Sequence, residues 1–562
     1  MRTYYTNLSE LLAEGAARFS NNLALSIPDG ISYTYKELHQ LSLNVASFLF
    51  GAGVSKGDKI AIIGENSPNW VAAYFGVHKA GAIAVPILTD FSTKEMESIL
   101  THSESSVVCV SSKEIDKFKG GFPAAIKYIV TLEDLRIHPV SNLSTLLSGS
   151  KNAYEQIETA DNPDHQHAFP DADKDELAVI IYTSGTTGRS KGVMLTHDNI
   201  IFDAVQTGTI HQVIESDVFL SVLPLAHTFE STIGLIVPLI YGASVYYTDR
   251  APTASYLGPL LQRIRPTTML TVPLIMEKIY RNKIAPGIQK SPVTRLLSRS
   301  SVTRKIIFRA AGKKLMAFFG GRMRFFGIGG APLAPDVERF LLDAKFPYAI
   351  GYGLTETSPM LAGFAPEEAI FRSVGTVMEG VDIRIENEDP DTGEGEIVAI
   401  GRNIMIGYYK NEEATREVFT GDGYFKTGDL GLFKDGILYI KGRSKNMILG
   451  PNGENIYPEE IESVINKHQF VSESLVMQVK GKLVAKVHLN FQQLEDKFHH
   501  VLNSVEDKQN KLNEKAEEVL EDLMSVVNEQ ISKNSRLQVI LLQVDPFEKT
   551  PTMKIKRYLY SD

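Results

Sequence analysis

Hydrophobic residues in the first third of the chain form short aliphatic runs that alternate with segments of helical spacing. Residues 59–63, 82–86 and 178–182 are such runs, whereas residues 35–50 and 70–80 repeat apolar side chains at helical intervals. Strands that are apolar on both faces and separated by helices are typical of parallel sheets covered on both sides. The pattern therefore predicts an α/β fold.

From about residue 381 the pattern changes to short strands joined by glycine and aspartate turns, at 382–385, 395–400 and 436–440. This alternation predicts antiparallel pairing. A polar, flexible stretch then follows, and we place a hinge within it at residues 443–445, between a domain of residues 1–442 and a smaller domain of residues 446–562.

The smaller domain contains a charged segment of helical spacing. Residues 491–533 carry Leu494, Phe498, Leu502 and Leu512 near one face. A helical hairpin packed on the small domain explains this spacing better than a coiled coil that binds a partner.

Composition narrows the class of protein. Of 562 residues, 43% are hydrophobic and 22% are charged, which is ordinary for a globular chain. Lys and Arg total 58 against 67 Asp and Glu, and the net charge of −9 argues against general nucleic-acid binding. The single cysteine, Cys109, excludes an internal disulfide, and we expect it to be a buried thiol.

The chain shows no sign of export or of a membrane span. Its amino terminus lacks the continuous apolar core of an export signal, and the longest apolar stretch, residues 233–247, is short and interrupted by Gly and Pro. We therefore expect a cytoplasmic protein, and peripheral contact with the inner face of the membrane stays open.

The most informative stretch runs from Tyr182 to Gly192, directly after a predicted strand. Its glycines and hydroxyl residues expose backbone amides that can surround phosphate oxygens, and Lys191 adds a mobile positive charge. The spacing differs from a Walker loop, because Gly185 and Gly188 are three apart and Lys191 precedes Gly192. The loop predicts phosphate binding and disfavours a P-loop ATPase or kinase.

Further glycine-rich and charged motifs follow in a fixed order, at 326–332, 351–359, 424–430, 441–445 and 549–557. The second of them holds a carboxylate, Glu356, in a glycine-bounded loop that can bind a hard cation through oxygen.

With these motifs the chain resembles the adenylate-forming superfamily over about residues 33–557. Within it the chain looks most like long-chain fatty-acid–CoA ligases, because of the segment 223–230, the insertion 280–324 and the segment 550–557.

The resemblance implies both a fold and an activity. The fold is α/β, with a large N-terminal domain of two α/β sheet subdomains and a small β-barrel-like subdomain, followed by a small mobile α+β C-terminal domain. The activity is AMP-forming activation of a medium- to long-chain fatty acid with ATP and Mg2+, followed by transfer to coenzyme A.

The resemblance also assigns roles to residues that match the family's motifs. Mg2+ would be held by Thr183 and Glu356, the α-phosphate would contact Thr355, and the ribose would contact Asp429 and Arg443. The β- and γ-phosphates would contact Thr183, Ser184, Gly185, Thr186, Thr187, Gly188 and Lys191, and the adenine would contact Gly329, Gly330, Ala331, Gly351, Tyr352 and Gly353.

The catalytic lysine of the family matches Lys554. The family usually has Gly before that lysine, whereas Met553 stands here, so Lys549 and Lys556 remain alternatives. Lys445 would lie at the pivot of the small domain, and residues 450–458 resemble the loop that would enter for thiol attack.

His227 would gate the acyl site, although a hydrogen-bonded loop histidine explains it nearly as well. The other histidines lack the spacing of a zinc site.

Two other functions stay open. One is an enzyme that stops at the acyl-adenylate or uses a carrier protein as acceptor, and the other is a non-catalytic homologue that binds acyl groups or nucleotide. The intact Lys191, Glu356, Asp429 and Lys554 argue against the second.

Residues 281–324 form a basic segment with no Asp or Glu and with twelve Lys or Arg among apolar residues. We predict that it contacts anionic membrane, and a helical insertion packed on the core is the equally weighted alternative.

Overall fold

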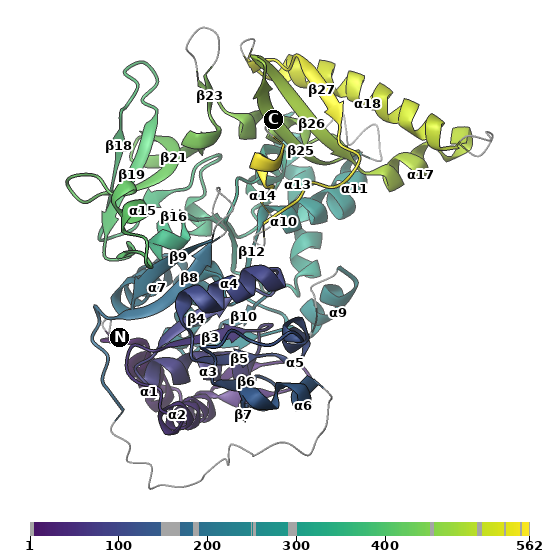
Figure 1. Ribbon diagram of the computed structural model, residues 1–562. Helices are drawn as coiled ribbons and strands as arrows, with labels where there is room; N and C mark the ends of the chain where they lie inside the picture. The colour runs from purple at the N-terminus through teal and green to yellow at the C-terminus, as the bar shows by residue number, and fades with distance from the viewer. Residues whose placement is uncertain are drawn as a thin grey trace.

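The computed structural model describes residues 5–147, 169–183, 190–248, 250, 254–289, 300–449, 455–502, 508–532, 535–550 and 554–560. In Figure 1, two large, mostly parallel sheets lie in the lower part of the molecule, antiparallel strands within residues 381–443 lie at the upper left, and most of the residues from 455 onward lie beside them at the upper right.

The first large sheet has eight strands, in which β8, β4, β3, β5 and β6 run parallel. β9 pairs antiparallel with both β8 and the edge strand β20, and the other edge strand, β7, pairs antiparallel with β6. In spatial order the strands are β20 (Gly407–Tyr408), β9 (Lys191–Thr196), β8 (Leu177–Thr183), β4 (Ile83–Ile87), β3 (Lys59–Ile63), β5 (Val107–Val110), β6 (Tyr128–Thr131) and β7 (Arg136–Pro139).

Both faces of this sheet are buried, as predicted. Ile60 and Ile62 of β3 pack with α2 (Tyr35–Gly51) and α3 (Pro68–Lys79), whereas Ala61 and Ile63 pack on the opposite side with α4 (Thr93–Ser103). Alternate side chains of a strand point to opposite faces, so a strand covered on both sides must be apolar throughout. Cys109 of β5 is a fully buried free thiol, as expected.

The second large sheet has seven strands that are parallel except for the edge strand β2. In spatial order these are β14 (Tyr348–Ile350), β13 (Phe325–Ile328), β12 (Thr268–Thr271), β10 (Val218–Leu220), β11 (Ser244–Tyr246), β1 (Leu23–Ser26) and β2 (Ser32–Thr34). The helices of this part of the chain are α1 (Leu8–Arg18), α7 (His197–His211), α8 (Val237–Tyr241), α9 (Ala254–Ile264), α13 (Ser301–Phe318) and α14 (Pro335–Ala344). Of these, α8 contacts β11 of this sheet, whereas α7 contacts β8 and β9 of the first sheet.

Two antiparallel sheets occupy the place of the expected β-barrel-like subdomain. One comprises β15 (Tyr352–Gly353), β16 (Met360–Gly363) and β17 (Thr376–Val377), and the other β18 (Val381–Glu386), β19 (Gly395–Gly401), β21 (Phe425–Lys434) and β22 (Ile437–Arg443). The predicted strands 382–385 and 395–400 lie within β18 and β19, and the predicted strand 436–440 begins one residue before β22; their antiparallel pairing is confirmed.

The C-terminal residues have a hydrophobic core of their own, which extends from Ile448 to Leu537. Its strands are β23 (Ile448–Leu449), β24 (Asn455–Ile456), β25 (Val471–Val479), β26 (Lys482–Leu489) and β27 (Val539–Leu542), and its helices are α16 (Pro458–Ile465), α17 (Phe491–Leu502) and α18 (Lys508–Gln530). The helices α17 and α18 contact each other and contribute Leu494 and Leu512 to this core, as the helical pattern predicted.

The remaining elements are short. They are α5 (Ser112–Ile115), α6 (Leu143–Leu147), α10 (Pro273–Ile279), α11 (Ala285–Gln289), α15 (Glu412–Glu417), two π-helices (Phe229–Ile236 and Tyr280–Ile284) and 3-10 turns that include η5 (Thr355–Thr357) and η7 (Ser444–Asn446). Among the described residues, no helix combines the length and apolar character needed to cross a bilayer.

A buried histidine ties the N-terminal helix to the sheets. His197 begins α7, is 2% exposed, and accepts a hydrogen bond at Nδ1 from the Leu8 backbone N–H (3.3 Å). Burial lowers its pKa to about 4, so the ring is neutral at physiological pH.

This burial makes stability depend on pH. The unfolded histidine takes up a proton near its usual pKa of about 6.5, whereas the folded histidine stays neutral down to a pH of about 4. Acidification therefore stabilises the unfolded state and lowers the free energy of unfolding. Between pH 7.5 and 5 the wild type should lose about 2 kcal/mol more unfolding free energy than His197→Asn. Denaturant unfolding at both pH values measures this, and equal losses in the two proteins would contradict it.

Candidate active site

The predicted phosphate lysine lies at the start of a strand. Lys191 opens β9 and pairs in register with Thr183, the last residue of β8. The rest of the predicted phosphate loop, Ser184, Gly185, Thr186, Thr187 and Gly188, lies outside the described residues.

Tyr408 connects two of the predicted site residues. Its hydroxyl donates to Glu356 Oε1 (2.9 Å), and its ring lies beneath Lys191 Nζ, with the centroid 4.7 Å away. The short strand β20 puts it there, because Tyr408 pairs with Val193 of β9. Burial and the Glu356 carboxylate raise the Tyr408 pKa, so the phenol keeps its proton and remains a donor.

Asp429 is a buried carboxylate with two partners. It is 5% exposed, accepts a hydrogen bond at Oδ2 from the Tyr352 hydroxyl (2.9 Å), and pairs at Oδ1 with Arg443 Nε (2.7 Å). Pairing between β21 and β22 places Asp429 opposite Arg443 in register. Burial raises the pKa of Asp429, while Arg443 and Tyr352 oppose that rise.

Lys554 reaches the same site from the end of the chain. Desolvation and Arg443 lower the pKa of Lys554 below its usual value, while the carboxylates of Asp429 and Glu356 oppose that decrease. Part of its side chain stays open to solvent. Four residues predicted from separate motifs, Glu356, Asp429, Arg443 and Lys554, therefore lie within electrostatic range of one another.

The neighbouring lysines are placed differently. Lys549 forms an ion pair with Glu473 of β25. Lys556 forms no ion pair with the described residues. Lys549 and Ile555 form an antiparallel bridge, and the carbonyl of Lys554 accepts a hydrogen bond from Thr550 N (2.8 Å). Of the three candidates, Lys554 is the one that the fold brings to Asp429 and Glu356.

The predicted adenine-binding residues follow the carboxyl ends of β13 and β14. Gly329, Gly330 and Ala331 come directly after β13, and the Gly351 N–H donates to the carbonyl of Ile328 (3.2 Å). Gly330 has a φ of +85°, a conformation that side chains other than glycine rarely adopt. In β15, a Cβ at Gly353 would lie 1.7 Å from the Pro359 carbonyl oxygen, so only glycine fits.

His227 is uncharged. Its Nδ1 accepts from the Phe229 backbone N–H (3.2 Å), and burial, with a further effect of nearby Lys554, lowers its pKa to about 4. It therefore lies near Lys554 as a neutral ring. Thr355 lies beside Glu356 in η5, and Lys445 is exposed in η7, directly after β22.

The donor set suits a magnesium–nucleotide complex better than a metal held by protein alone. No cluster of three or more His, Cys, Asp or Glu able to hold a metal occurs among the residues that the structure describes. Glu356 is a single carboxylate oriented by Tyr408, and η5 contacts β9, which pairs with Thr183. Magnesium commonly takes one or two carboxylates and completes its shell with phosphates and water.

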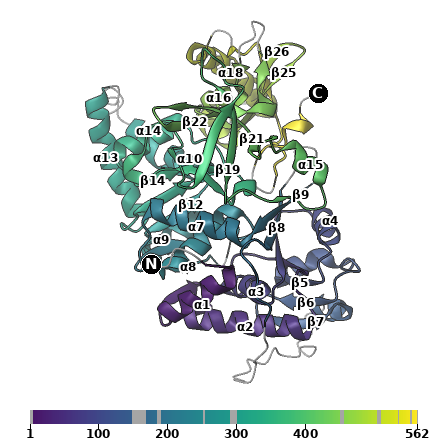
Figure 2. The same ribbon diagram turned by 90° about the vertical axis from the view of Figure 1, so that its left-hand side faces the viewer.

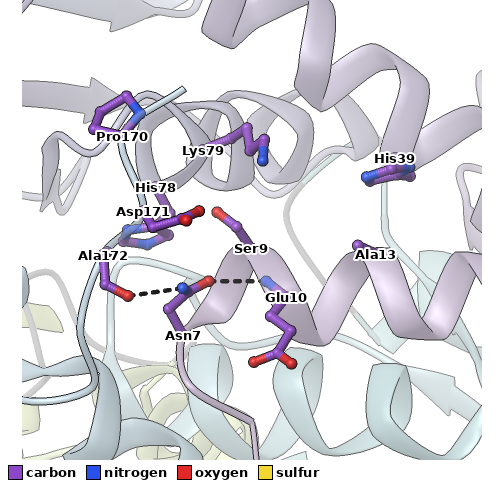
Figure 3. Close-up of a pocket in the computed structure, with 10 residues that line it drawn as sticks. All are labelled: Asn7, Ser9, Glu10, Ala13, His39, His78, Lys79, Pro170, Asp171 and Ala172. Atoms are coloured by element: carbon purple, nitrogen blue, oxygen red, sulfur yellow. Dashed lines mark hydrogen bonds between the residues drawn. The ribbon is translucent and has the colours of Figure 1, made fainter. Parts of the chain in front are cut away.

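A pocket of about 240 Å³, partly open to solvent, lies elsewhere (Figure 3). It is bounded by α1, α2, α3 and residues 170–172, and its wall includes Ser9, His78 and Lys79. None of the predicted site residues lines it, so it is separate from the site around Asp429.

Comparison with known proteins identifies the family of the chain. The family described as AMP-binding enzyme matches residues 12–409. The chain belongs to this AMP-binding enzyme family.

Relatives and solved structures support the assignment to the AMP-binding enzymes. Long chain acyl-CoA synthetase 3 of Arabidopsis thaliana is 30% identical over 79% of this chain and 70% of its own length. The chloroplastic long-chain-fatty-acid–[acyl-carrier-protein] ligase AEE15 of the same plant is 25% identical over 98% of this chain and 83% of its own. O-succinylbenzoate coenzyme A synthetase (MenE) of Bacillus subtilis, solved with ATP and magnesium ion, is 25% identical with a TM-score of 0.73, over 98% of each chain.

These matches show that the chain is an adenylate-forming ligase, and they support binding of ATP. They also confirm the predicted fold class over nearly the whole chain. Sequence reasoning missed Tyr408, because Gly407 and Tyr408 form a two-residue strand outside every motif.

Tyr408 gives a test that separates its ring from its hydroxyl. Tyr408→Phe keeps the ring beneath Lys191 but removes the donor to Glu356, a bond to a charged group worth about 1.5–3 kcal/mol. We expect the half-saturating Mg2+ concentration in ATP–pyrophosphate exchange to rise by about tenfold or more. Tyr408→Leu should in addition raise the KM for ATP, because Lys191 loses the ring.

Tyr409→Phe is the matched control, because Tyr409 contacts Lys59 and Lys410 rather than Glu356. An unchanged Mg2+ requirement in Tyr408→Phe would show that its hydroxyl does not orient Glu356.

Proposed function

We propose that this adenylate-forming ligase is an AMP-forming acyl-CoA synthetase that activates a medium- to long-chain fatty acid. The observation that carries the proposal is the placement of Lys554 within electrostatic range of Asp429, Arg443 and Glu356. The named activity of the Arabidopsis synthetase supports the fatty-acid part. We further propose a cytoplasmic location.

The chemistry explains why such a site needs positive charge. A carboxylate is a poor acyl donor, because its charge repels nucleophiles and an oxide leaves badly. In the first step the carboxylate oxygen attacks the α-phosphorus of ATP, the bond to the β-phosphate oxygen breaks, and pyrophosphate leaves with the electron pair. In the second step the coenzyme A sulfur, having lost its proton, attacks the acyl carbon and AMP leaves.

Two anions meet in the first step, so positioning and charge neutralisation dominate the catalysis. In the proposal Lys554 bridges the acyl carboxylate and the α-phosphate, which Thr355 also contacts, and Lys191 holds the outer phosphates. Asp429 accepts hydrogen bonds from the ribose hydroxyls, and Arg443 holds Asp429 in place. His227, as a neutral ring, borders the acyl carboxylate.

Glu356 and Thr183 would hold magnesium with the phosphates. When bound, the ion would neutralise charge on the leaving pyrophosphate. Tyr408 would keep the Glu356 carboxylate facing the nucleotide.

We also propose that residues 446–562 move as a unit about a hinge at residues 443–445, with Lys445 at the pivot, relative to residues 1–442. The separate core of the C-terminal residues supports this, as does the exposure of Lys445. Part of the loop proposed to enter for thiol attack, residues 450–454, lies outside the described residues.

A carrier protein is the alternative acceptor, and the named activity of the plant ligase AEE15 favours it. A pyrophosphate-release screen over carboxylic acids of increasing length, with coenzyme A, with an acyl-carrier protein and with neither, decides both substrate and acceptor. Thioester with coenzyme A from fatty acids of medium or greater length is expected. Thioester with the carrier protein alone would support the alternative, and no pyrophosphate with any acid would refute the adenylation itself.

Lys554→Ala tests the role of the lysine. Removing one charge-stabilising donor typically costs about 10²–10³-fold in rate, and we expect a loss of that size in adenylate formation. Formation of thioester from supplied acyl-adenylate should change little, because the carboxylate has by then been activated. Lys556→Ala is the matched control and should leave both half-reactions intact. Equal losses of both half-reactions in Lys554→Ala would remove the assigned role.

A further inference from the structure

The basic segment 281–324 divides into internally paired and unpaired charges. Three arginines form ion pairs within the protein: Arg281 with Asp336 (3.5 Å), Arg304 with Asp343 (2.8 Å) and Arg324 with Asp217 (2.8 Å). Among the described residues, six other basic side chains of the segment form no ion pair: Lys283, Lys305, Arg309, Lys313, Lys314 and Arg322.

Four of these six lie on α13, whose inner side is fixed to the protein. Phe308, Gly312 and Leu315 of α13 are buried, and α13 contacts α14. A Cβ at Gly312 would lie 2.8 Å from the Ala344 Cβ, so the two helices approach closely. In Figure 2, α13 lies at the left edge of the molecule, with one side away from the other elements.

The outer face of α13 combines charge with exposed aliphatic side chains. We define this outer face as Val302, Lys305, Ile306, Arg309, Lys313 and Lys314, all of which are exposed. Val302 is 67% and Ile306 63% exposed, which places both among the most exposed large hydrophobic side chains of the described residues. At 100° per residue, Val302, Ile306, Arg309 and Lys313 fall on one stripe of the helix.

We propose that the outer face of α13 docks on an anionic lipid bilayer. Lys305, Arg309, Lys313 and Lys314 contact lipid phosphates, and Val302 and Ile306 insert among the first acyl carbons. Two aliphatic side chains bury too little area for binding without charge, whereas each basic residue near an anionic surface contributes about 1 kcal/mol. The net charge of −9 makes this local positive face the side that an anionic membrane attracts.

A membrane explains the face better than an acidic carrier protein does, because a bilayer accommodates both the lysines and the aliphatic pair at their centre. Docking would place the enzyme where fatty acids partition. That benefit depends on the proposed fatty-acid substrate, whereas the docking itself does not.

Vesicle sedimentation of the full chain tests the proposal without turnover. The wild type should bind vesicles of phosphatidylglycerol and phosphatidylethanolamine, bind pure phosphatidylcholine far more weakly, and release from the anionic vesicles at high salt. Each basic residue near the surface is worth about fivefold in partitioning. Changing Lys305, Arg309, Lys313 and Lys314 to Gln should therefore weaken binding by about 100-fold or more.

A matched control removes four lysines elsewhere. Lys36, Lys94, Lys434 and Lys482 are exposed and form no ion pair with any described residue, so their change to Gln alters net charge equally. This control should bind anionic vesicles nearly as the wild type does. The double variant Val302→Ser, Ile306→Ser should bind more weakly than the wild type at every salt concentration while keeping the salt dependence.

Several outcomes would overturn the proposal. The first is that the outer-face variant and the lysine control bind anionic vesicles equally. The second is that the wild type binds phosphatidylcholine vesicles as well as it binds anionic ones. The third is that the outer-face variant keeps vesicle binding and loses only its reaction rate with an acidic carrier protein. All variants should keep ATP–pyrophosphate exchange with a water-soluble acid. If the wild type bound vesicles but showed no exchange with any acid, the proposed function would fail and the docking surface would stand.

Discussion

Charge balance among four side chains is the constraint on which the site depends. Two carboxylates, Glu356 and Asp429, and two cations, Arg443 and Lys554, arrive from separate segments, and each influences the ionisation of another. A buried carboxylate is costly unless it is paired and hydrogen-bonded. Arg443 and Tyr352 meet that requirement for Asp429, and the pairing of β21 with β22 supplies the geometry. Much of the antiparallel region can be understood as the scaffold of this one pair.

The sequence predicted the local elements well where burial dictated the pattern. Residues 59–63 form β3 as predicted, and the helix expected over 35–50 ends one residue later, at Gly51. The helix predicted from Trp70 begins at Pro68, because Ser67 caps it by accepting from the Trp70 N–H. Strand order within the sheets was beyond local reasoning, because neighbours such as β4 and β8 are separated by about ninety residues of chain and pair through long-range packing.

The candidate site likewise contains residues that the sequence predicted and residues that it could not predict. Lys191, Glu356, Asp429, Arg443 and Lys554 could be located from the sequence. Each lies in a glycine-rich or charged motif that can be recognised without knowledge of the fold. Tyr408 has no such signature: its importance comes from a two-residue strand that sets it between Lys191 and Glu356. Nor could spacing alone choose among Lys549, Lys554 and Lys556, because that choice depends on Glu473, a partner 76 residues away from Lys549 in sequence.

The ion pairs on either side of Lys554 have a consequence for the control of the reaction. Lys549 is fastened to Glu473, and Arg557 to Glu462 (2.6 Å), on either side of Lys554. Glu473 belongs to β25 and Glu462 to α16. In the proposed hinge motion, the position of Lys554 would therefore follow the position of these two elements. A molecule that bound this part of the chain and restricted its movement, however far from the phosphates, would therefore limit the rate of the reaction.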